Sequence, residues 1–411
     1  MGTKLFSLSM ALVLCLTLFP VTALAATPNG QVIYVGNENV TNGGYWTTDS
    51  DGNVTASTAG ETPTDNYISY DAENNVLTLH NATIKESVST ETNSFIAGAA
   101  IGVHNQNGAA ELTITLEGTN TIAEVGKGIY VLASSDSTGD ASLTITGDGS
   151  LDASASQTGI WVQSNSGNAT LTIRNAKVEA TGTSTVGYGV NVQSSNSSTA
   201  ALTVDGGSLT ASGSPGILYD SIGSGTVPNT TALTISNSAI VDAREGGIGA
   251  GLLQDLKEVS PADDSVGIVF DGDDGTVYGN VTLDESLTIG EGESLTIPNG
   301  SSLNGNGKLT NKGTIIVEKG GNLTGDPGGK VVYAPAITNH PQDVEVKEDE
   351  TATFTVEATG SDLSYQWQQS TDKGSSWTNI ARATSDTYTT GKTTMDMSGT
   401  QYRCVVSNSA G

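Results

Sequence analysis

Cysteine is scarce in this sequence, which limits how the chain can be stabilised. Of the 411 residues, two are cysteine. Cys15 lies in an apolar run that follows Lys4 and precedes "TALAA", the layout of a secretory signal peptide that ends at Ala25. The mature chain would keep Cys404 as its single thiol, so we expect no internal disulfide and stability that comes from packing.

Basic residues and long apolar runs are also scarce. Lys and Arg total 16 against 44 Asp and Glu, and the formal net charge is −28. Such a field repels nucleic acid and anionic lipid surfaces, so we expect no nucleic-acid partner. Beyond the signal peptide at 1–25, no segment reaches membrane-spanning length. We therefore expect no membrane insertion and an extracellular product, either secreted or held at the cell surface.

What the sequence does contain is a repeat rich in Thr, Ser and aliphatic residues, typical of an all-β protein. The stretch "LTIRNAKVEATG", residues 171–182, has near copies along the chain. The first leucines of these copies are Leu77, Leu112, Leu143, Leu171, Leu202 and Leu233. They recur every 28 to 35 residues, a period typical of stacked repeats.

Each period holds three strand-like runs: one beginning "LTI", one like "KVEA", and a Gly-led run such as "GIWVQ". If the chain coils, each run can pair in parallel with its copy in the next turn and bury its apolar side. Residues 65–325 therefore resemble right-handed parallel β-helix proteins, a solenoid. We expect long turns over 65–255, a loop or insertion at 256–280, and short turns over 281–325, where aliphatic residues recur every six to eight positions.

Asparagine and glycine recur four residues after the first leucine of most copies. The positions are Asn81, Gly147, Asn175, Gly206 and Asn237. These two residue types best tolerate a left-handed backbone. The column therefore predicts a tight corner of the coil, with a structural role for its asparagines.

Residues 26–64 alternate as strands around Asn-Gly-Gly and Asp-Gly turns. We expect hairpins there that cap the open end of the coil, because a solenoid otherwise exposes strand edges. This region resembles the openings of adhesin-like wall proteins of gut bacteria.

The pattern changes after a predicted linker at 326–334. "YQWQQ" contains Trp367, and Tyr402 stands two residues before Cys404. These residues resemble the core Trp and the tyrosine corner of a bacterial immunoglobulin-like (Ig-like) β-sandwich, over residues 335–411. The resemblance implies that Cys404 is a buried free thiol. It also implies that the last strand of the sandwich would follow Gly411, so we expect a truncated module with an exposed sheet edge.

Motifs for catalysis, metals or cofactors do not appear. His80, His104 and His340 share no metal or triad spacing, and no nucleophile or phosphate-loop pattern is found. We therefore predict no catalytic residues, no metal site and no cofactor. "DGDDG", residues 271–275, lacks the ligands of a calcium loop and is predicted to be an acidic turn.

Carboxylates recur at one position of the second run. Asp152, Glu179 and Asp242 should lie outward in one column, interrupted by Thr210, with neighbours about 4.8 Å apart. Calcium binding and paired-acid chemistry on a sugar are the alternatives here. Solvated surface charge is the preferred interpretation, since no basic residue recurs beside the column to serve as the strong base of a lyase.

The third run predicts an aromatic face. Strand alternation places Tyr130 and Trp161 outward on neighbouring turns, flanked by Gln163, Asn191 and Gln193. Flat rings beside amide groups suit the mixed apolar and hydroxyl surface of a sugar. The competing interpretation is that a long corner loop folds over the rings and buries them.

These features together favour an extracellular, adhesin-like protein without catalysis. It would bind a polysaccharide or surface glycan on the solenoid, with the Ig-like module as a spacer. One alternative is a polysaccharide lyase or glycoside hydrolase, and another is a purely structural stalk. The oligomeric state is left open by the sequence.

Overall fold

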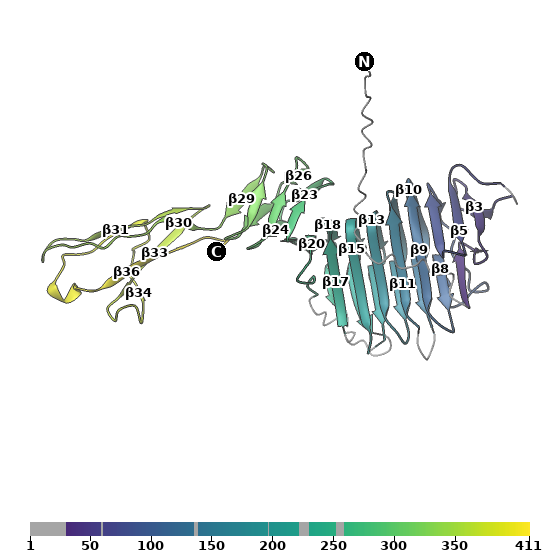
Figure 1. Ribbon diagram of the computed structural model, residues 1–411, viewed down its shortest axis with the longest axis horizontal. Helices are drawn as coiled ribbons and strands as arrows, with labels where there is room; N and C mark the ends of the chain where they lie inside the picture. The colour runs from purple at the N-terminus through teal and green to yellow at the C-terminus, as the bar shows by residue number, and fades with distance from the viewer. Residues whose placement is uncertain (1–29, 59–60, 135–138, 196, 222–229, 252–258) are drawn as a thin grey trace, which may run out of the picture.

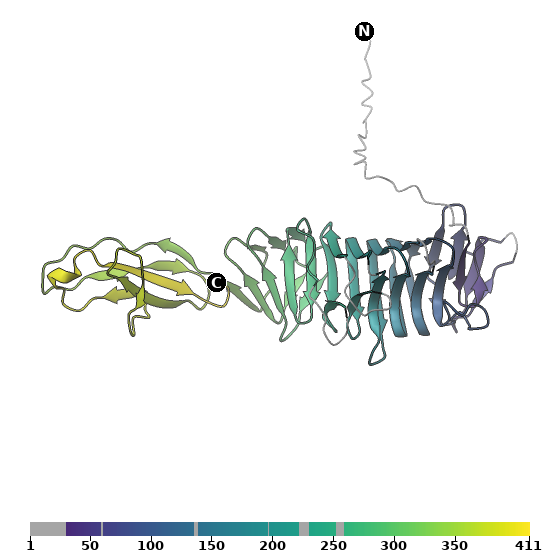
Figure 2. The ribbon, with the colours of Figure 1, turned by 90° about the horizontal axis from the view of Figure 1, so that it is seen from below.

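The computed structural model describes residues 30–58, 61–134, 139–195, 197–221, 230–251 and 259–411. The signal peptide expected at 1–25 lies outside these ranges. The described chain is all-β apart from one 3₁₀ turn, η1 (Met395–Met397). None of its helices has the length and apolar character needed to cross a membrane. Three parts follow one another along an elongated molecule: a long coil (residues 76–250), a short coil (274–333) and a C-terminal module (336–411) (Figure 1, Figure 2).

The long coil belongs to a β-solenoid of about five turns. Its first face contains β6 (Val76–His80), β9 (Ala110–Glu117), β11 (Ala141–Gly147), the first halves of β13 (Ala169–Gly182) and β15 (Thr199–Ser212), and β17 (Thr230–Ser236). Its second face contains β7 (Thr83–Ile84), the first parts of β10 (Thr119–Ala133) and β12 (Ser150–Ser164), the second halves of β13 and β15, and β18 (Ala239–Ala243). Its third face contains β8 (Ala99–Asn105), the last parts of β10 and β12, β14 (Tyr188–Ser194), β16 (Ile217–Ser221) and β19 (Ile248–Ala250). Copies in successive turns pair in parallel.

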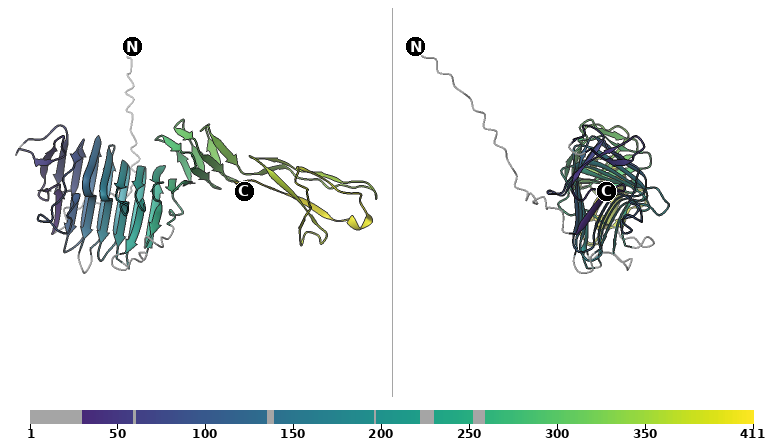
Figure 3. Two further views of the ribbon diagram at one scale, coloured as in Figure 1. Left: turned by 180° about the vertical axis from the view of Figure 1, so that it is seen from behind. Right: turned by 90° about the vertical axis from the view of Figure 1, so that its right-hand side faces the viewer.

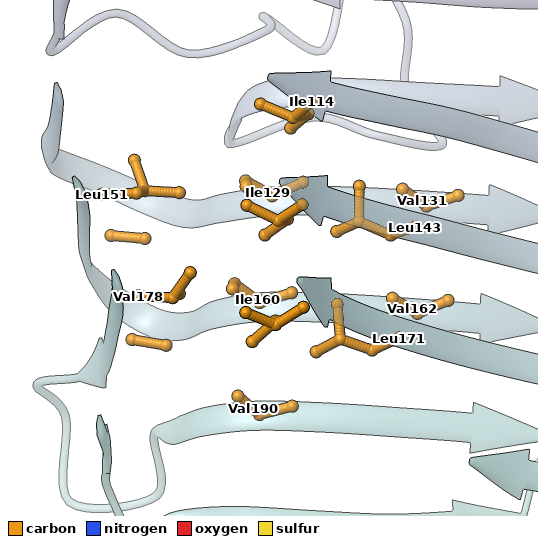
Figure 4. Packing of buried hydrophobic residues seen from close by; sticks show 14 of the residues in the cluster. Ile114, Ile129, Val131, Leu143, Leu151, Ile160, Val162, Leu171, Val178 and Val190 are labelled. Atoms are coloured by element: carbon orange, nitrogen blue, oxygen red, sulfur yellow. The ribbon is translucent and has the colours of Figure 1, made fainter. Parts of the chain in front are cut away.

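The repeated leucines form a continuous ladder inside the coil. The strand registers align Leu112, Leu143, Leu171, Leu202 and Leu233 along the axis, and each is at most 2% exposed. Figure 4 shows Leu143 and Leu171 stacked beside the Ile129 and Ile160 column. The predicted stacking is thus confirmed from Leu112 onward. Leu77 instead lies opposite Ile114, a shift of register that keeps Leu77 facing inward.

The residues of the predicted corner column all have the left-handed backbone that Asn and Gly tolerate. Every one of its members has a positive φ: Asn81 49°, Gly147 113°, Asn175 50°, Gly206 70° and Asn237 54°. Asn81 Oδ1 accepts a hydrogen bond from the Thr119 amide of the next turn at 3.1 Å. The corner therefore combines left-handed backbone with a contact between turns.

An antiparallel hairpin, β20 (Gly267–Asp271) and β21 (Asp274–Tyr278), joins the two coils. It occupies part of the stretch 256–280 that was expected to be a loop or insertion, and "DGDDG" forms its turn. One face of the short coil is β21, β24 (Ser294–Ile297), β27 (Thr314–Val317) and β29 (Lys330–Tyr333). The others are β22 (Asn280–Thr282), β25 (Ser302–Asn304) and β28 (Asn322–Thr324), and β23 (Leu287–Ile289) with β26 (Leu309–Asn311). β29 lies within the predicted linker 326–334, so the coil extends through it.

Antiparallel strands close the N-terminal end of the long coil. β1 (Gln31–Val35) pairs with β8 and with the short β2 (Glu38–Asn39). β5 (Tyr67–Asp71) pairs with β6, and β3 (Gly44–Thr48) joins β5 to β4 (Val54–Ala56). These strands occupy the edges that the first turn would otherwise leave unpaired.

The C-terminal module is built from three small antiparallel sheets. They are β30 (Ala336–Asn339) with β32 (Glu357–Thr359), β31 (Thr353–Thr355) with β35 (Thr387–Thr389), and β34 (Thr378–Asn379) with β33 (Ser364–Ser370) and β36 (Gln401–Ser407). Trp367 is fully buried, and its Nε1 donates to Ser385 O at 2.9 Å. Cys404 is a free thiol, but it is half-buried instead of buried as expected. Its cover is incomplete because the outer edge of β36 pairs with no described strand.

Candidate functional site

The third face of the long coil brings the predicted aromatic and amide residues together. Tyr130, Trp161 and Asn191 are register partners on successive turns, and Gln163 and Gln193 are partners two residues further along. The rings of Tyr130 and Trp161 stack, with centroids 4.7 Å apart and planes inclined by 27°. All five residues therefore share one patch of the third face. Figure 3 (left) shows the long coil from behind, with its strands stacked along the axis.

The segment between β7 and β8 covers part of this face. Val88 and Ile96 of that segment pack against Tyr130, which points away from the interior but is only 5% exposed. Trp161 remains partly exposed, whereas Asn191 is 3% exposed. Tyr130 thus supports the ring of Trp161 and offers no exposed surface of its own. The competing interpretation expected a loop to bury both rings, and the structure shows this for Tyr130 alone.

Hydrogen bonds fix most polar groups of the face. The Tyr130 hydroxyl donates to Gln163 Oε1 at 2.6 Å, and Gln193 Nε2 donates to Asp220 Oδ2 at 3.1 Å. Burial raises the pKa of Tyr130 and of Asp220. Trp161 Nε1 and Asn191 Oδ1 have no hydrogen-bond partner among the described residues. One unused donor and one unused acceptor therefore lie on adjacent turns.

A lysine lies over the same rings. Lys127 Nζ is 5.3 Å from the ring centroid of Tyr130 and 5.9 Å from that of Trp161. It donates to Ala97 O at 3.0 Å, and burial lowers the pKa of its ammonium group. Lys127 therefore ties the covering segment to the aromatic pair through a cation–π contact.

The acidic column on the second face has the predicted register. Asp152, Glu179, Thr210 and Asp242 are successive partners across β12, β13, β15 and β18. A groove of about 540 Å³ borders the part of the column from Glu179 to Asp242. Its lining includes Glu179, Thr210, Asp242, Arg244 and Glu293. Within the described residues, no group of three or more potential ligands is placed to hold a metal ion.

Arg244 is the residue of this groove that sequence reasoning missed. Its Nη2 donates to Asp242 at 2.6 Å, and its Nη1 donates to Glu293 of the short coil at 2.7 Å. Its guanidinium also lies 4.3 Å from the ring centroid of Phe270. In the sequence, Arg244 stood out only as a single departure from the repeat, the Arg in "IVDAR". Its partner Glu293 belongs to the short coil, so the repeat pattern did not link the two residues. Arg244 therefore clamps the two coils together.

The same contacts decide what Arg244 can do chemically. Burial alone lowers the pKa of the guanidinium, but hydrogen bonds to Asp242 and Glu293 and their charges raise it above its usual value. A guanidinium held in its charged form cannot take a proton from a sugar. Arg244 is therefore not available as the general base of a lyase.

Replacing Arg244 with alanine is expected to lower the free energy of unfolding by about 2 kcal/mol, because two carboxylates lose their shared cation. This loss is smaller than for a fully buried ion pair, because the side chains of Arg244, Asp242 and Glu293 are 18 to 22% exposed. Urea unfolding followed by circular dichroism measures it. Arg174→Ala is the matched control: Arg174 is 53% exposed and 3.9 Å from Asp205, so the midpoint should hardly move. Equal effects of the two changes would contradict the clamp.

The three histidines lie apart and each has its own contacts. His80 Nδ1 is 3.0 Å from Glu117 Oε2 and its ring stacks on Tyr67. His104 Nε2 is 2.8 Å from Ser134 Oγ, and burial lowers the pKa of the His104 imidazole. His340 is exposed in the C-terminal module. These placements bring no two histidines into one site.

Comparison with known proteins gives one match. A family described as a domain of unknown function (DUF8696) matches residues 338–411, within the C-terminal module. No curated protein and no solved structure matches the chain.

Proposed function

We propose that this chain is a secreted or cell-surface, adhesin-like protein that binds a glycan without catalysis. The glycan contacts the third face of the long coil around Trp161, and the C-terminal module, an Ig-like sandwich, serves as a spacer. The observation that carries the proposal is the partly exposed indole of Trp161, held by Tyr130 behind it and bordered by Gln163 and Gln193.

The physical argument is one of complementarity. The face of a pyranose ring carries C–H groups, and an aromatic ring packs against them, while amides pair with the hydroxyls at the ring edge. Tyr130 and Lys127 fix the orientation of Trp161 before a ligand arrives, which reduces the entropy lost on binding. The excess of acidic residues favours an uncharged glycan over a polyanionic one.

Two alternative functions would use other parts of the surface. A glycan-cleaving enzyme would use the acidic column, but the cation beside that column, Arg244, is held charged between Asp242 and Glu293. A purely structural stalk would use neither the column nor Trp161.

The test is retention on a glycan array. Trp161→Ala is expected to weaken glycan binding by roughly tenfold or more, because an aromatic anchor carries much of the energy of such a contact. Trp377→Ala, in the C-terminal module, is the matched control and should bind normally. Unchanged binding by Trp161→Ala would reject the site. New reducing ends or unsaturated sugars that disappear in Glu179→Gln would establish the enzyme, and no retention by the wild type would favour the stalk.

A further inference from the structure

A carboxylate continues the row of amides that borders Trp161. Strand register places Gln163, Gln193 and Asp220 opposite one another on β12, β14 and β16, which belong to three successive turns of the third face. These three side chains are partly exposed, as is Trp161, whereas Asn191 beside Trp161 is buried. The row from Gln163 to Asp220 is therefore the accessible continuation of the Trp161 surface along the axis of the coil.

Asp220 is a half-buried carboxylate without a cation. Its Oδ2 accepts a hydrogen bond from Gln193 Nε2 at 3.1 Å, and its Oδ1 accepts one from the Ser221 amide at 2.6 Å. Among the described residues, no Lys, Arg or His lies within ion-pair distance of this carboxylate. Burial raises the pKa of Asp220, and the two hydrogen bonds oppose that shift. Because a carboxylate can accept about four hydrogen bonds, Asp220 keeps acceptor positions that these two donors leave open.

Asp242, on the second face, shows the same kind of carboxylate with a cation in place. Its side chain is 18% exposed and pairs with Arg244 at 2.6 Å. Removing a charge from water is unfavourable unless hydrogen bonds and an opposite charge replace the lost hydration. Asp220 has the hydrogen bonds but lacks the cation, so an ammonium group supplied by a ligand would complete its surroundings.

The third face carries opposite charges at its two ends. Lys127 lies on β10 and Asp220 on β16, and the strands follow one another along the axis as β10, β12, β14 and β16. Three turns therefore separate the two residues, about 14 Å at the usual sheet spacing, which exceeds the Debye length of about 8 Å at physiological salt. Trp161, on β12, lies two turns from Asp220, or about 10 Å. A ligand that stacks on Trp161 and reaches Asp220 must therefore extend along the axis, away from Lys127.

We propose that the glycan bound at Trp161 is an amino-sugar oligomer, and that a free ammonium group on one of its sugars pairs with Asp220. This inference rests on the proposed function and specifies its ligand. One sugar stacks on the indole, the oligomer follows the row of Gln163 and Gln193, and the ammonium group donates charge-assisted hydrogen bonds to the open acceptor positions of Asp220. The net charge of −28 also favours the approach of a cationic glycan.

Isothermal titration of the full chain with three tetramers of one backbone tests the ammonium group directly. The tetramers are β-1,4-linked glucose, glucosamine and N-acetylglucosamine, which carry a hydroxyl, an ammonium or an acetamide group at the same carbon. At a slightly acidic pH, the sugar amine is protonated while carboxylates stay ionised. The glucosamine tetramer is expected to bind about tenfold more tightly than either of the other two, the effect of one charge-assisted hydrogen bond. Added salt should reduce this preference.

Two charge variants separate pairing at Asp220 from general attraction to an acidic protein. Asp220→Asn keeps the shape of the side chain and removes its charge, so it is expected to abolish the preference for glucosamine and to leave the affinity for the glucose tetramer unchanged. Asp148→Asn removes the same charge from an exposed position of the long coil outside the third face, and it should keep the preference. Trp161→Ala should weaken binding of all three tetramers, because each of them stacks on the indole.

Equal affinities for the glucosamine and glucose tetramers would overturn the inference, and so would an Asp220→Asn chain that retains the preference. In both cases the proposed function stands if binding of the glucose tetramer still depends on Trp161. Absence of binding by all three tetramers would also overturn the inference, and retention on the glycan array then decides separately whether the proposed function survives.

Discussion

Replacing Leu171 with aspartate is expected to unfold the long coil. Leu171 is fully buried, with Leu143 and Leu202 as its register partners in the turns on either side. A carboxylate at this position would meet aliphatic side chains along the axis, with no cation to pair with. The loss in free energy of unfolding should exceed about 4 kcal/mol, a value reserved for buried unpaired charge.

The neighbouring Thr172 provides the control. It lies on the same strand with its side chain on the outer surface, where it is half-buried. Thr172→Asp should change the free energy of unfolding by less than about 1 kcal/mol, as is usual for surface positions. Thermal unfolding by circular dichroism, together with limited proteolysis, compares the two. A Leu171→Asp chain that melts with the wild type would contradict a continuous aliphatic interior.

Parts of the fold that follow from periodicity could be predicted from the sequence. Once the chain coils, side chains at equivalent positions of each copy must occupy the same height in successive turns. This reasoning located the leucine ladder from Leu112, the left-handed corner at Asn175, and the column of Asp152, Glu179 and Asp242. The Leu77 register was missed because a shift by two residues preserves the inward pattern.

Parts that depend on single, unrepeated contacts could not be predicted. The segment that buries Tyr130 has no counterpart in the other turns, so its path left no periodic signal. Arg244 meets Glu293 because a hairpin joins the two coils, and neither residue identifies the other in sequence. Trp161 was placed correctly by strand alternation, but its partial exposure depends on the covering segment. The arrangement of these residues on one face was therefore predictable, and their exposure was not.

Replacing Gly159 with alanine is the second change with a large expected effect. Glycines open the third run of several turns, at Gly128, Gly159, Gly189 and Gly216. A Cβ on Gly159 would lie 2.7 Å from Thr181 N and 2.8 Å from Gly189 O, both of them backbone atoms of the next turn. The space between adjacent turns is too small for a methyl group at this position. To remove the clash, the two turns would have to separate locally. We expect a loss of about 3 kcal/mol in the free energy of unfolding, the upper range for overpacking.

Gly108→Ala separates this crowding from the general effect of adding a methyl group. A Cβ there would meet only Asn105 Nδ2, at an ordinary 3.6 Å, so its free energy of unfolding should stay within about 0.5 kcal/mol of the wild type. Urea unfolding measures both variants. Gly159 also lies two residues before Trp161, so its alanine variant should lose glycan retention along with stability. A Gly159→Ala chain that unfolds at the wild-type midpoint would show that the turns can separate at little cost, and the rigid placement of Trp161 would then need another origin.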